Sequence, residues 1–186
     1  MLIFIKMRKE IFQEIEVPEG MEVEVKGNLI KLKENGKEIE KKFDIHNITI
    51  ERKKNKIIIG DKKATKNEKK VINTIAAHIK NMIKGVREEF KYNLKVCSSH
   101  FPITVEVEGS EIIIKNFLGE KVPRKTKIVP GADVKVERDT ITITSPNKES
   151  AGQTAANLEK ATWIRSRDRR IFQDGIFITN KAGKSI

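Results

Sequence analysis

Four arginines fall within six residues of the chain, in the segment Arg165-Ser-Arg-Asp-Arg-Arg170. The arginine side chain presents a planar fork of N–H donors that fits a phosphate group bidentately. A dense arginine cluster between regular elements is therefore a candidate phosphate-binding site. The alternative is a solvated basic turn without a ligand, and the cluster alone does not decide between these two interpretations.

The composition favours a polyanionic partner. The 186 residues carry a net charge of +12 at pH 7, and 34% of the side chains are charged. An excess of this size is typical of proteins that bind nucleic acid, with an anionic membrane as the other candidate partner. No stretch approaches the ~18 uncharged apolar residues of a spanning helix, so we expect no membrane partner.

Two features of the sequence bear on the compartment. Cys97 is the only cysteine, which excludes an intrachain disulfide and indicates a reducing environment. The apolar start of the chain, residues 1–5, is too short for the core of a signal peptide. We therefore expect the protein to remain in the cytoplasm.

Further basic segments are candidates for the same ligand. A second basic run supplies Lys121, Arg124, Lys125 and Lys127, and the C-terminal tail supplies Lys181 and Lys184. The run is equally consistent with an exposed edge strand whose charges prevent pairing with another chain. We expect the tail to be a mobile polar end that can follow a nucleic-acid backbone.

Residues that could hold a metal or act as a nucleophile do not form a recognisable motif. The glycines are spread singly, so no Gly-rich phosphate loop is predicted. The histidines His46, His78 and His100 are far apart in sequence. Cys97 and His100 supply only two of the about four ligands that a zinc site needs. We therefore expect no metal site and no cofactor.

Three carboxylates offer the remaining route to catalysis. Glu159, Asp168 and Asp174 are candidates for a magnesium-dependent nuclease cluster. Each also has a simpler role: Glu159 as helix surface, Asp168 as a partner of the arginines, and Asp174 as part of a turn. The simpler roles are favoured, so we expect no enzymatic activity and no small-molecule substrate.

The first half of the chain reads as several strands followed by one helix. Residues 11–17 and 21–25 alternate between apolar and polar positions, which predicts strands. Further strands are predicted at residues 28–33, 38–43, 48–52 and 56–59. Apolar residues spaced by three and four over residues 71–86 predict an amphipathic helix, with Thr65 or Asn67 as its cap and Gly85 as its end.

The same order of predicted strands and helix then occurs a second time in the chain. Val105-Glu-Val-Glu-Gly109 repeats Val23-Glu-Val-Lys-Gly27, and residues 134–138 correspond to residues 48–52. A period of roughly 80 residues indicates a duplicated domain rather than a solenoid. The predicted fold class is α+β: two tandem copies of a small antiparallel β-sheet, each covered on one face by a single α-helix, with domains 1–84 and 85–186.

The second helix, expected at residues 150–164, differs from the first. Its apolar stripe, from Ala151 to Trp163, is weaker, and short polar groups replace the isoleucines. Because duplicated units often share a fold while one copy carries the function, we assign the function to the second copy. The aromatic residues are not closely spaced, so we expect contacts to phosphates and 2′-hydroxyls of folded RNA rather than base stacking.

Three segments carry a family resemblance. They are Ser99-His-Phe-Pro102 ahead of residues 105–109, Asn116-Phe-Leu-Gly-Glu-Lys121, and the C-terminal segment of residues 167–178. Together they resemble the archaeal and eukaryotic form of the uL6 family of large-subunit ribosomal proteins, over essentially the whole chain. The C-terminal segment is the most specific match, and the Tyr-Lys-Gly-Lys-Gly-type segment of the bacterial branch is missing.

The resemblance implies a structural ribosomal protein that binds large-subunit ribosomal RNA chiefly through its second domain. It implies a position near the sarcin–ricin loop and the stalk base, where translation GTPases dock, among neighbouring ribosomal proteins. The RNA-binding residues expected from it are Lys160, Arg165, Arg167, Arg169 and Arg170, then Lys121, Arg124, Lys125 and Lys127, with Lys181 and Lys184 in the tail. Asp168 is expected to orient arginines and Gly175 to allow a turn. A free-standing RNA chaperone or regulator remains the alternative, ahead of the nuclease.

Overall fold

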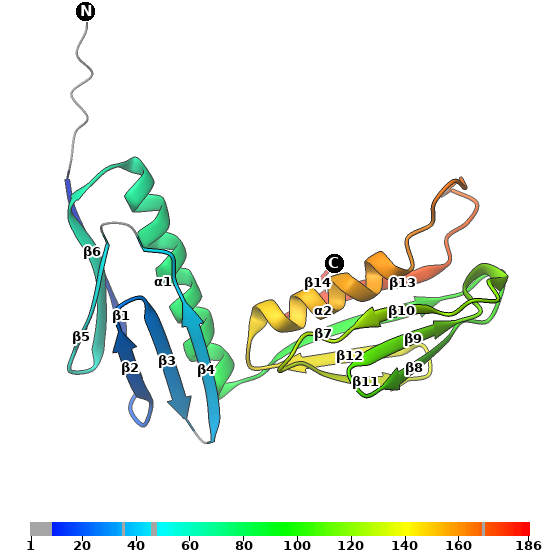
Figure 1. The fold of residues 1–186 in the computed structure, drawn as a ribbon, viewed down its shortest axis with the longest axis horizontal. Coiled ribbons are helices and arrows are strands. Elements are labelled where there is room, and N and C mark those ends of the chain that lie inside the picture. The colour runs from blue at the N-terminus through cyan, green and yellow to red at the C-terminus, as the bar shows by residue number, and fades with distance from the viewer. Residues whose placement is uncertain (1–8, 35, 46–47, 169) are drawn as a thin grey trace, which may run out of the picture. The chain divides into compact units, whose positions relative to one another are not determined.

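A computed structural model of the chain describes residues 9–34, 36–45, 48–168 and 170–186. The chain divides into two compact units, Met1–Arg87 and Glu88–Ile186 (Figure 1). In the described residues of each unit, antiparallel strands and one α-helix enclose a separate hydrophobic core. The described part of the chain is thus a mixed α/β structure with several antiparallel sheets and two α-helices.

Unit 1 contains two three-stranded antiparallel sheets. One has the order β1-β6-β5, and the other has the order β2-β3-β4. The strands are β1 (Lys9–Glu16), β2 (Glu22–Lys26), β3 (Leu29–Glu34), β4 (Lys37–Lys42), β5 (Thr49–Lys53) and β6 (Lys56–Ala64). Alternation along these strands places Ile30, Leu32, Ile57 and Ile59 in the core with no exposed surface.

The helix of unit 1, α1 (Lys66–Arg87), begins with a capping box. Asn67 N–H donates to Thr65 Oγ1 at 3.3 Å, and Thr65 N–H donates to Glu68 Oε2 at 2.8 Å. The predicted end at Gly85 is wrong, because the helix continues for two more residues. Val86 is buried in the core of unit 1, and its packing keeps the last turn helical.

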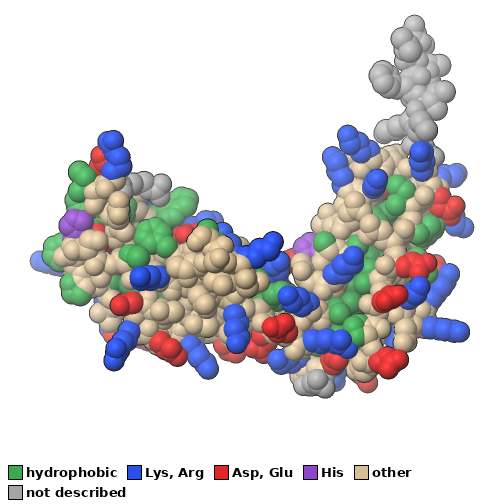
Figure 2. All heavy atoms as spheres, turned by 180° about the vertical axis from the view of Figure 1, so that it is seen from behind, with side chains coloured by type: hydrophobic (Ala, Val, Ile, Leu, Met, Phe, Trp, Pro, Cys, Tyr) green, Lys and Arg blue, Asp and Glu red, His purple; other side chains and the backbone are tan. Residues whose placement is uncertain are grey.

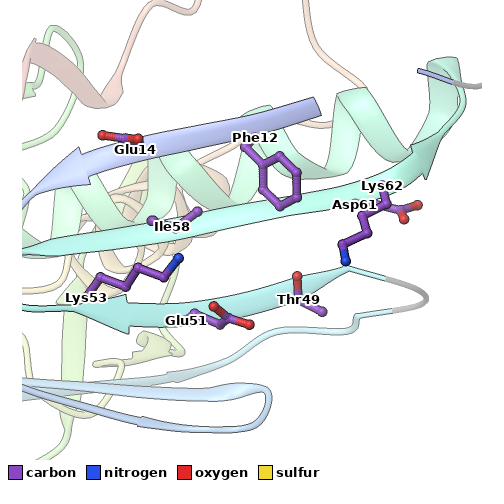
Figure 3. Close-up of a pocket in the computed structure, with 8 residues that line it drawn as sticks. All are labelled: Phe12, Glu14, Thr49, Glu51, Lys53, Ile58, Asp61 and Lys62. Carbon is purple, nitrogen blue, oxygen red and sulfur yellow. The ribbon is translucent and has the colours of Figure 1, made fainter. Parts of the chain in front are cut away.

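Gly60 lies in β6, the central strand of the sheet β1-β6-β5, and the ring of Phe12 on β1 covers it. Figure 3 shows the Phe12 ring extending from its strand toward the neighbouring strand of the sheet. A Cβ at Gly60 would lie 2.5 Å from the Ile11 carbonyl oxygen and closer still to the Phe12 ring. The ring can move, but the backbone oxygen belongs to the strand pairing and cannot.

We expect Gly60→Ala to lower the free energy of unfolding of unit 1 by about 1–3 kcal/mol, because the added methyl group overpacks the sheet. Urea denaturation followed by circular dichroism measures the change. Lys62→Ala, an exposed substitution on the same strand, is the control and should remain within about 0.5 kcal/mol of the parent. Equal stability of the two variants would contradict the close approach.

Unit 2 contains a five-stranded antiparallel sheet and a three-stranded one. Their orders are β11-β12-β7-β13-β14 and β10-β9-β8. The strands are β7 (Phe90–Cys97), β8 (Thr104–Glu108), β9 (Glu111–Lys115), β10 (Arg124–Lys127), β11 (Asp133–Glu137), β12 (Thr140–Ser145), β13 (Gly175–Lys181) and β14 (Lys184–Ser185), with a short 3-10 turn η1 (Phe117–Gly119). The helix α2 (Lys148–Ala161) packs against both sheets through Ala151, Ala155 and Leu158.

The helix α2 ends earlier than its apolar pattern predicts. Asn147 caps its start by accepting the Glu149 N–H at 3.0 Å, and its last residue is Ala161. The hydroxyl of Thr162, which follows, accepts the Ile176 N–H at 2.9 Å and so ties the helix end to β13. Trp163, expected in the buried stripe, therefore lies beyond the helix with 51% of its surface exposed.

The C-terminal tail is not the mobile end that the sequence predicts. β13 and β14 form a hairpin in which Lys181 lies opposite Lys184. Gly183 adopts a φ of +89°, which suits the turn, and its N–H donates to Asn180 Oδ1 at 2.9 Å.

In the part of the chain that the structure describes, no helix is long and apolar enough to span a bilayer.

Candidate nucleic-acid interface

The predicted arginine cluster lies in the loop of residues 162–174, which joins α2 to β13 and is called the arginine loop below. Asp168 organises its centre: the Oδ1 atom accepts the Arg170 N–H at 2.9 Å, and Oδ2 lies 3.0 Å from Arg170 Nη2. The hydrogen bonds from the Arg170 side chain and backbone hold the pKa of Asp168 below its usual range. Asp168 is therefore a charged carboxylate that orients an arginine.

Three cationic side chains of the arginine loop face solvent. Arg165 and Arg167 are exposed, and the Arg170 side chain is 90% exposed despite its pair with Asp168. The Arg167 guanidinium lies over the Phe172 ring, 4.8 Å from its centroid, and this contact favours one position of the side chain while leaving it exposed. Arg169 lies outside the described residues.

Hydrogen bonds to a buried carboxylate anchor the C-terminal end of the loop. Asp174, with 1% of its surface exposed, accepts the backbone N–H groups of Ser99 and His100 on one oxygen. Its other oxygen lies 2.5 Å from His100 Nδ1, and the His100 ring stacks on Phe172 with centroids 4.9 Å apart. The start of β13 is thereby locked to the end of β7.

The charge state of Asp174 follows from these contacts. Burial of the carboxyl raises its pKa, but the hydrogen bonds from His100 and Ser99 outweigh that cost and hold the pKa below the ordinary range. The group is therefore an ionised acceptor with three protein donors.

Arg124, one of the predicted RNA-binding residues, braces the near end of the loop. Its Nη1 donates to the Ala161 carbonyl at 2.8 Å and to the Trp163 carbonyl at 3.3 Å. The same guanidinium forms a two-pronged ion pair with Glu120, at 2.8 and 2.5 Å, and lies 4.2 Å from the centroid of the Phe117 ring. The hydrogen bond from Arg124 holds the pKa of Glu120 below its usual range. Arg124 thus joins β10 to the end of α2.

This brace brings the two predicted basic runs together. β10, which carries Lys125 and Lys127, is the edge strand of its sheet and packs against α2. The Lys127 carbonyl accepts a 3.4 Å hydrogen bond from Asn157 Nδ2 on α2, and Lys160 lies in the last turn of that helix. Both interpretations of the run are thus compatible, because an edge strand can also present lysines to a ligand.

The remaining predicted contacts lie elsewhere. Lys181 and Lys184 are at the opposite end of β13 from the arginine loop, paired across the hairpin. Lys121 is exposed just before β10. Figure 2 shows lysine and arginine side chains spread over the visible face of both units, with acidic side chains between them. The arginine loop with β10 is therefore the densest predicted set that the fold assembles.

The alternative nuclease cluster does not assemble. Asp168 is engaged with Arg170, and Asp174 is buried with three donors, while Glu159 belongs to α2. Among the described residues, no three histidine, cysteine or acidic side chains converge to hold a metal ion.

Sequence reasoning missed the residues that hold the loop in place. Thr162 and the pair of His100 with Asp174 act through contacts with other segments of the chain, and Glu120 acts through Arg124, which reaches the Ala161 carbonyl. Hydrophobic periodicity carries no signal for such contacts. The C-terminal segment was singled out only through its family resemblance and its arginines.

Comparisons with known proteins give a consistent result. The family described as ribosomal protein L6 matches residues 101–175, which include η1, α2 and the whole arginine loop. The large ribosomal subunit protein uL6 of Methanococcus vannielii is 43% identical over 174 residues, covering 94% of this chain and 96% of that protein. The protein of the same name from Methanobrevibacter smithii is 45% identical over 171 residues, covering 92% and 96%. With identity of this level along nearly its whole length, the chain belongs to the uL6 family of large ribosomal subunit proteins.

Proposed function

We propose that the protein is an architectural component of the large ribosomal subunit that binds ribosomal RNA through the arginine loop and β10 of unit 2. The observation that carries this proposal is the braced loop, in which Arg165, Arg167 and Arg170 are exposed while the backbone at its two ends is tied to α2, β7 and β13. Arginines held at fixed spacing suit the backbone of a folded RNA, where phosphates have fixed spacing too.

The predicted RNA-binding residues fall into two groups according to the exposure of their side chains. We assign direct contacts to Lys160, Arg165, Arg167 and Arg170, and to Lys121, Lys125 and Lys127 beside them. Arg124 acts chiefly by positioning the loop, because its side chain is only 29% exposed and engaged with protein groups. Arg169 is included by its place in the sequence alone, and Lys181 and Lys184 form a separate, secondary contact.

Two parts of the proposal go beyond what membership of the uL6 family establishes. The first is the location near the sarcin–ricin loop and the stalk base, close to the docking region of translation GTPases. The second is that the two units are tandem copies of one domain; the matching order of strands, with β1 to β6 and α1 corresponding to β7 to β12 and α2, supports it. The protein works in the cytoplasmic ribosome, and the family is structural rather than enzymatic.

Directed hydroxyl-radical probing tests both the binding and the location. Ser166→Cys in a Cys97→Ala background places a single cysteine in the exposed part of the loop, where an iron chelate can be attached. In reconstituted large subunits, we expect strand cleavage in the sarcin–ricin stem and the stalk base. Cleavage elsewhere in the large-subunit RNA would keep the RNA contact but refute the location.

The runner-up is a free-standing RNA chaperone or regulator, which also needs exposed cations. Sedimentation of a cell extract through a low-salt sucrose gradient separates the two functions. We expect the protein to travel with the large subunit. If it stays at the top of the gradient, the architectural role is refuted and the chaperone role is favoured.

A further inference from the structure

The turn of residues 116–120, which contains η1 and leads from β9 toward β10, has no role in the phosphate contacts assigned above. Three of its residues have a positive φ: Asn116 at +59°, Leu118 at +50° and Gly119 at +77°. The left-handed region is costly for a leucine, and backbone in this state persists only where the surrounding structure enforces it. Such a turn points to a group that it holds in place.

The surroundings of the turn fix its backbone. The Phe117 side chain is 1% exposed and belongs to the core of unit 2. Asn116 Nδ2 donates to the Pro102 carbonyl at 3.0 Å. At the end of the turn, the Glu120 N–H donates to the Phe117 carbonyl at 2.9 Å. The position of Glu120 is therefore set by the core.

The carboxylate of Glu120 determines what Arg124 can bind. Its two oxygens accept from Nε and Nη2 of Arg124 at 2.8 and 2.5 Å, while Nη1 of the same guanidinium donates to the Ala161 and Trp163 carbonyls. A guanidinium engaged in this way has no parallel pair of donors left for a phosphate. Glu120 thus makes Arg124 a brace for the end of α2 and not a phosphate ligand.

The charge of Glu120 itself opposes the binding of RNA. Its side chain is 40% exposed, so a ligand at this surface meets the carboxylate. The hydrogen bond from Arg124 holds the pKa of Glu120 below its ordinary range, and the charge of Arg167 acts in the same direction. Glu120 is therefore ionised and attracts an arginine that is assigned to phosphate. A surface that served only to attract polyanions would be stronger without this carboxylate.

The two effects of Glu120 act differently on two classes of RNA. A flexible single strand adapts to any arrangement of cations, so it responds mainly to the charge of the surface. A folded RNA has phosphates at fixed positions and gains affinity from cations that are already in place. Because specificity is a difference between two affinities, one carboxylate can strengthen the first kind of complex less than the second, or even weaken it.

We propose that Glu120 is the residue that makes the site selective for folded RNA over flexible single strands, by holding Arg124 as a brace of the arginine loop and away from phosphate. The proposal rests on the RNA-binding function of unit 2 and adds to it a class of preferred RNA and the residue that determines the preference. It also gives a role to the segment of residues 116–121, which was singled out in the sequence only by its family resemblance.

The test compares the full-length parent with Glu120→Gln on two RNAs: large-subunit ribosomal RNA folded in magnesium, and poly(U), which has no fixed structure. The glutamine amide cannot accept both hydrogen bonds from Arg124, so the brace is released. We expect the affinity for ribosomal RNA to fall by about five- to tenfold, as for the loss of a charge-assisted hydrogen bond. The affinity for poly(U) should rise by about threefold, and its salt slope should steepen by about 0.7, because one more arginine is free to meet a phosphate.

Matched variants separate position from charge. Glu120→Asp keeps the charge but is too short for the two-pronged pair, so it should lose affinity for ribosomal RNA without a gain for poly(U). Glu137→Gln removes the same charge from an exposed position of β11 and should leave the ratio of the two affinities unchanged. In an Arg124→Gln background, adding Glu120→Gln should cause no further loss for ribosomal RNA, because the pair is already broken.

The direction of the two changes decides the outcome. If Glu120→Gln raises both affinities in proportion, the residue is only a surface charge and the proposal is overturned. If it lowers both in proportion, its role is merely structural and the proposal is overturned as well. Either result leaves the RNA-binding function standing, whereas a parent protein without affinity for large-subunit RNA refutes the function and the proposal together.

Hydrogen exchange followed by mass spectrometry gives an independent readout on the free protein. We expect the amides of the arginine loop, residues 162–174, to exchange faster in Glu120→Gln than in the parent, because the end of α2 has lost its brace. The hairpin of β11 and β12 serves as the internal control and should exchange at the parent's rate, which shows that unit 2 remains folded. Unchanged exchange in the loop would overturn the positioning role.

Discussion

Replacing Arg165, Arg167 and Arg170 together by glutamine lowers the affinity for large-subunit ribosomal RNA by about a hundredfold or more at 0.1 M salt. Each lost phosphate contact removes about 0.7–0.9 from the slope of log affinity against log salt. The slope should therefore become shallower by about two to three. Filter binding over a series of salt concentrations measures both quantities.

The parent protein provides the reference for this comparison. If it neutralises about six to ten phosphates, its affinity falls by about a thousandfold or more between 50 and 200 mM salt. A matched control is Lys62→Gln, Lys63→Gln and Lys66→Gln combined, which removes the same charge from exposed positions of unit 1. An equal loss in both triple variants would mean that net charge, rather than the arginine loop, determines binding.

Replacing Asp174 by asparagine lowers the free energy of unfolding of unit 2 by about 2–3 kcal/mol. The variant loses the charge that attracts three donors around a buried group, and its amide cannot accept all three hydrogen bonds equally well. For a unit of this size, the melting temperature should fall by about 10 °C or more. Calorimetry measures the change, with the transition of unit 1 as internal reference.

The pH dependence of stability provides the check on this assignment. The pKa of Asp174 is depressed in the folded state. The stability that its ionised carboxylate contributes to unit 2 is therefore complete above the unfolded pKa of about 3.9, and it is lost as the pH falls through the lower folded pKa. The stability of unit 2 should therefore decline in acid less steeply in Asp174→Asn than in the parent. Asp168→Asn, at a 43% exposed side chain, should leave the stability of unit 2 nearly unchanged, because solvent screens its pair with Arg170.

Most of the strands and α1 were predictable from the sequence, because an element that is buried on one face has apolar residues at a regular spacing. The alternation at residues 11–17 is found again as β1, and the stripe of Ile72, Ile75 and Ile79 becomes the buried face of α1. The family resemblance of the whole chain was likewise carried by local motifs, and it is confirmed.

The end of α2 and the course of the tail were not predictable in this way. The chain leaves the helix at Thr162 because its hydroxyl meets Ile176, a residue on a strand that the local pattern does not contain. The tail turns back because Lys184 pairs with Lys181 in the hairpin. In both places a tertiary or turn interaction overrides the local pattern.

The braces around the arginine loop have a thermodynamic consequence. Arg124, Thr162 and Asp174 fix the backbone on either side of the arginines when unit 2 folds, so the conformational entropy of ordering the loop is lost at that stage. A basic tail that folds on RNA loses the same entropy during assembly and shows a large negative heat-capacity change. Unit 2 should instead dock without ordering its loop, with a small heat-capacity change and an association rate governed by electrostatic attraction.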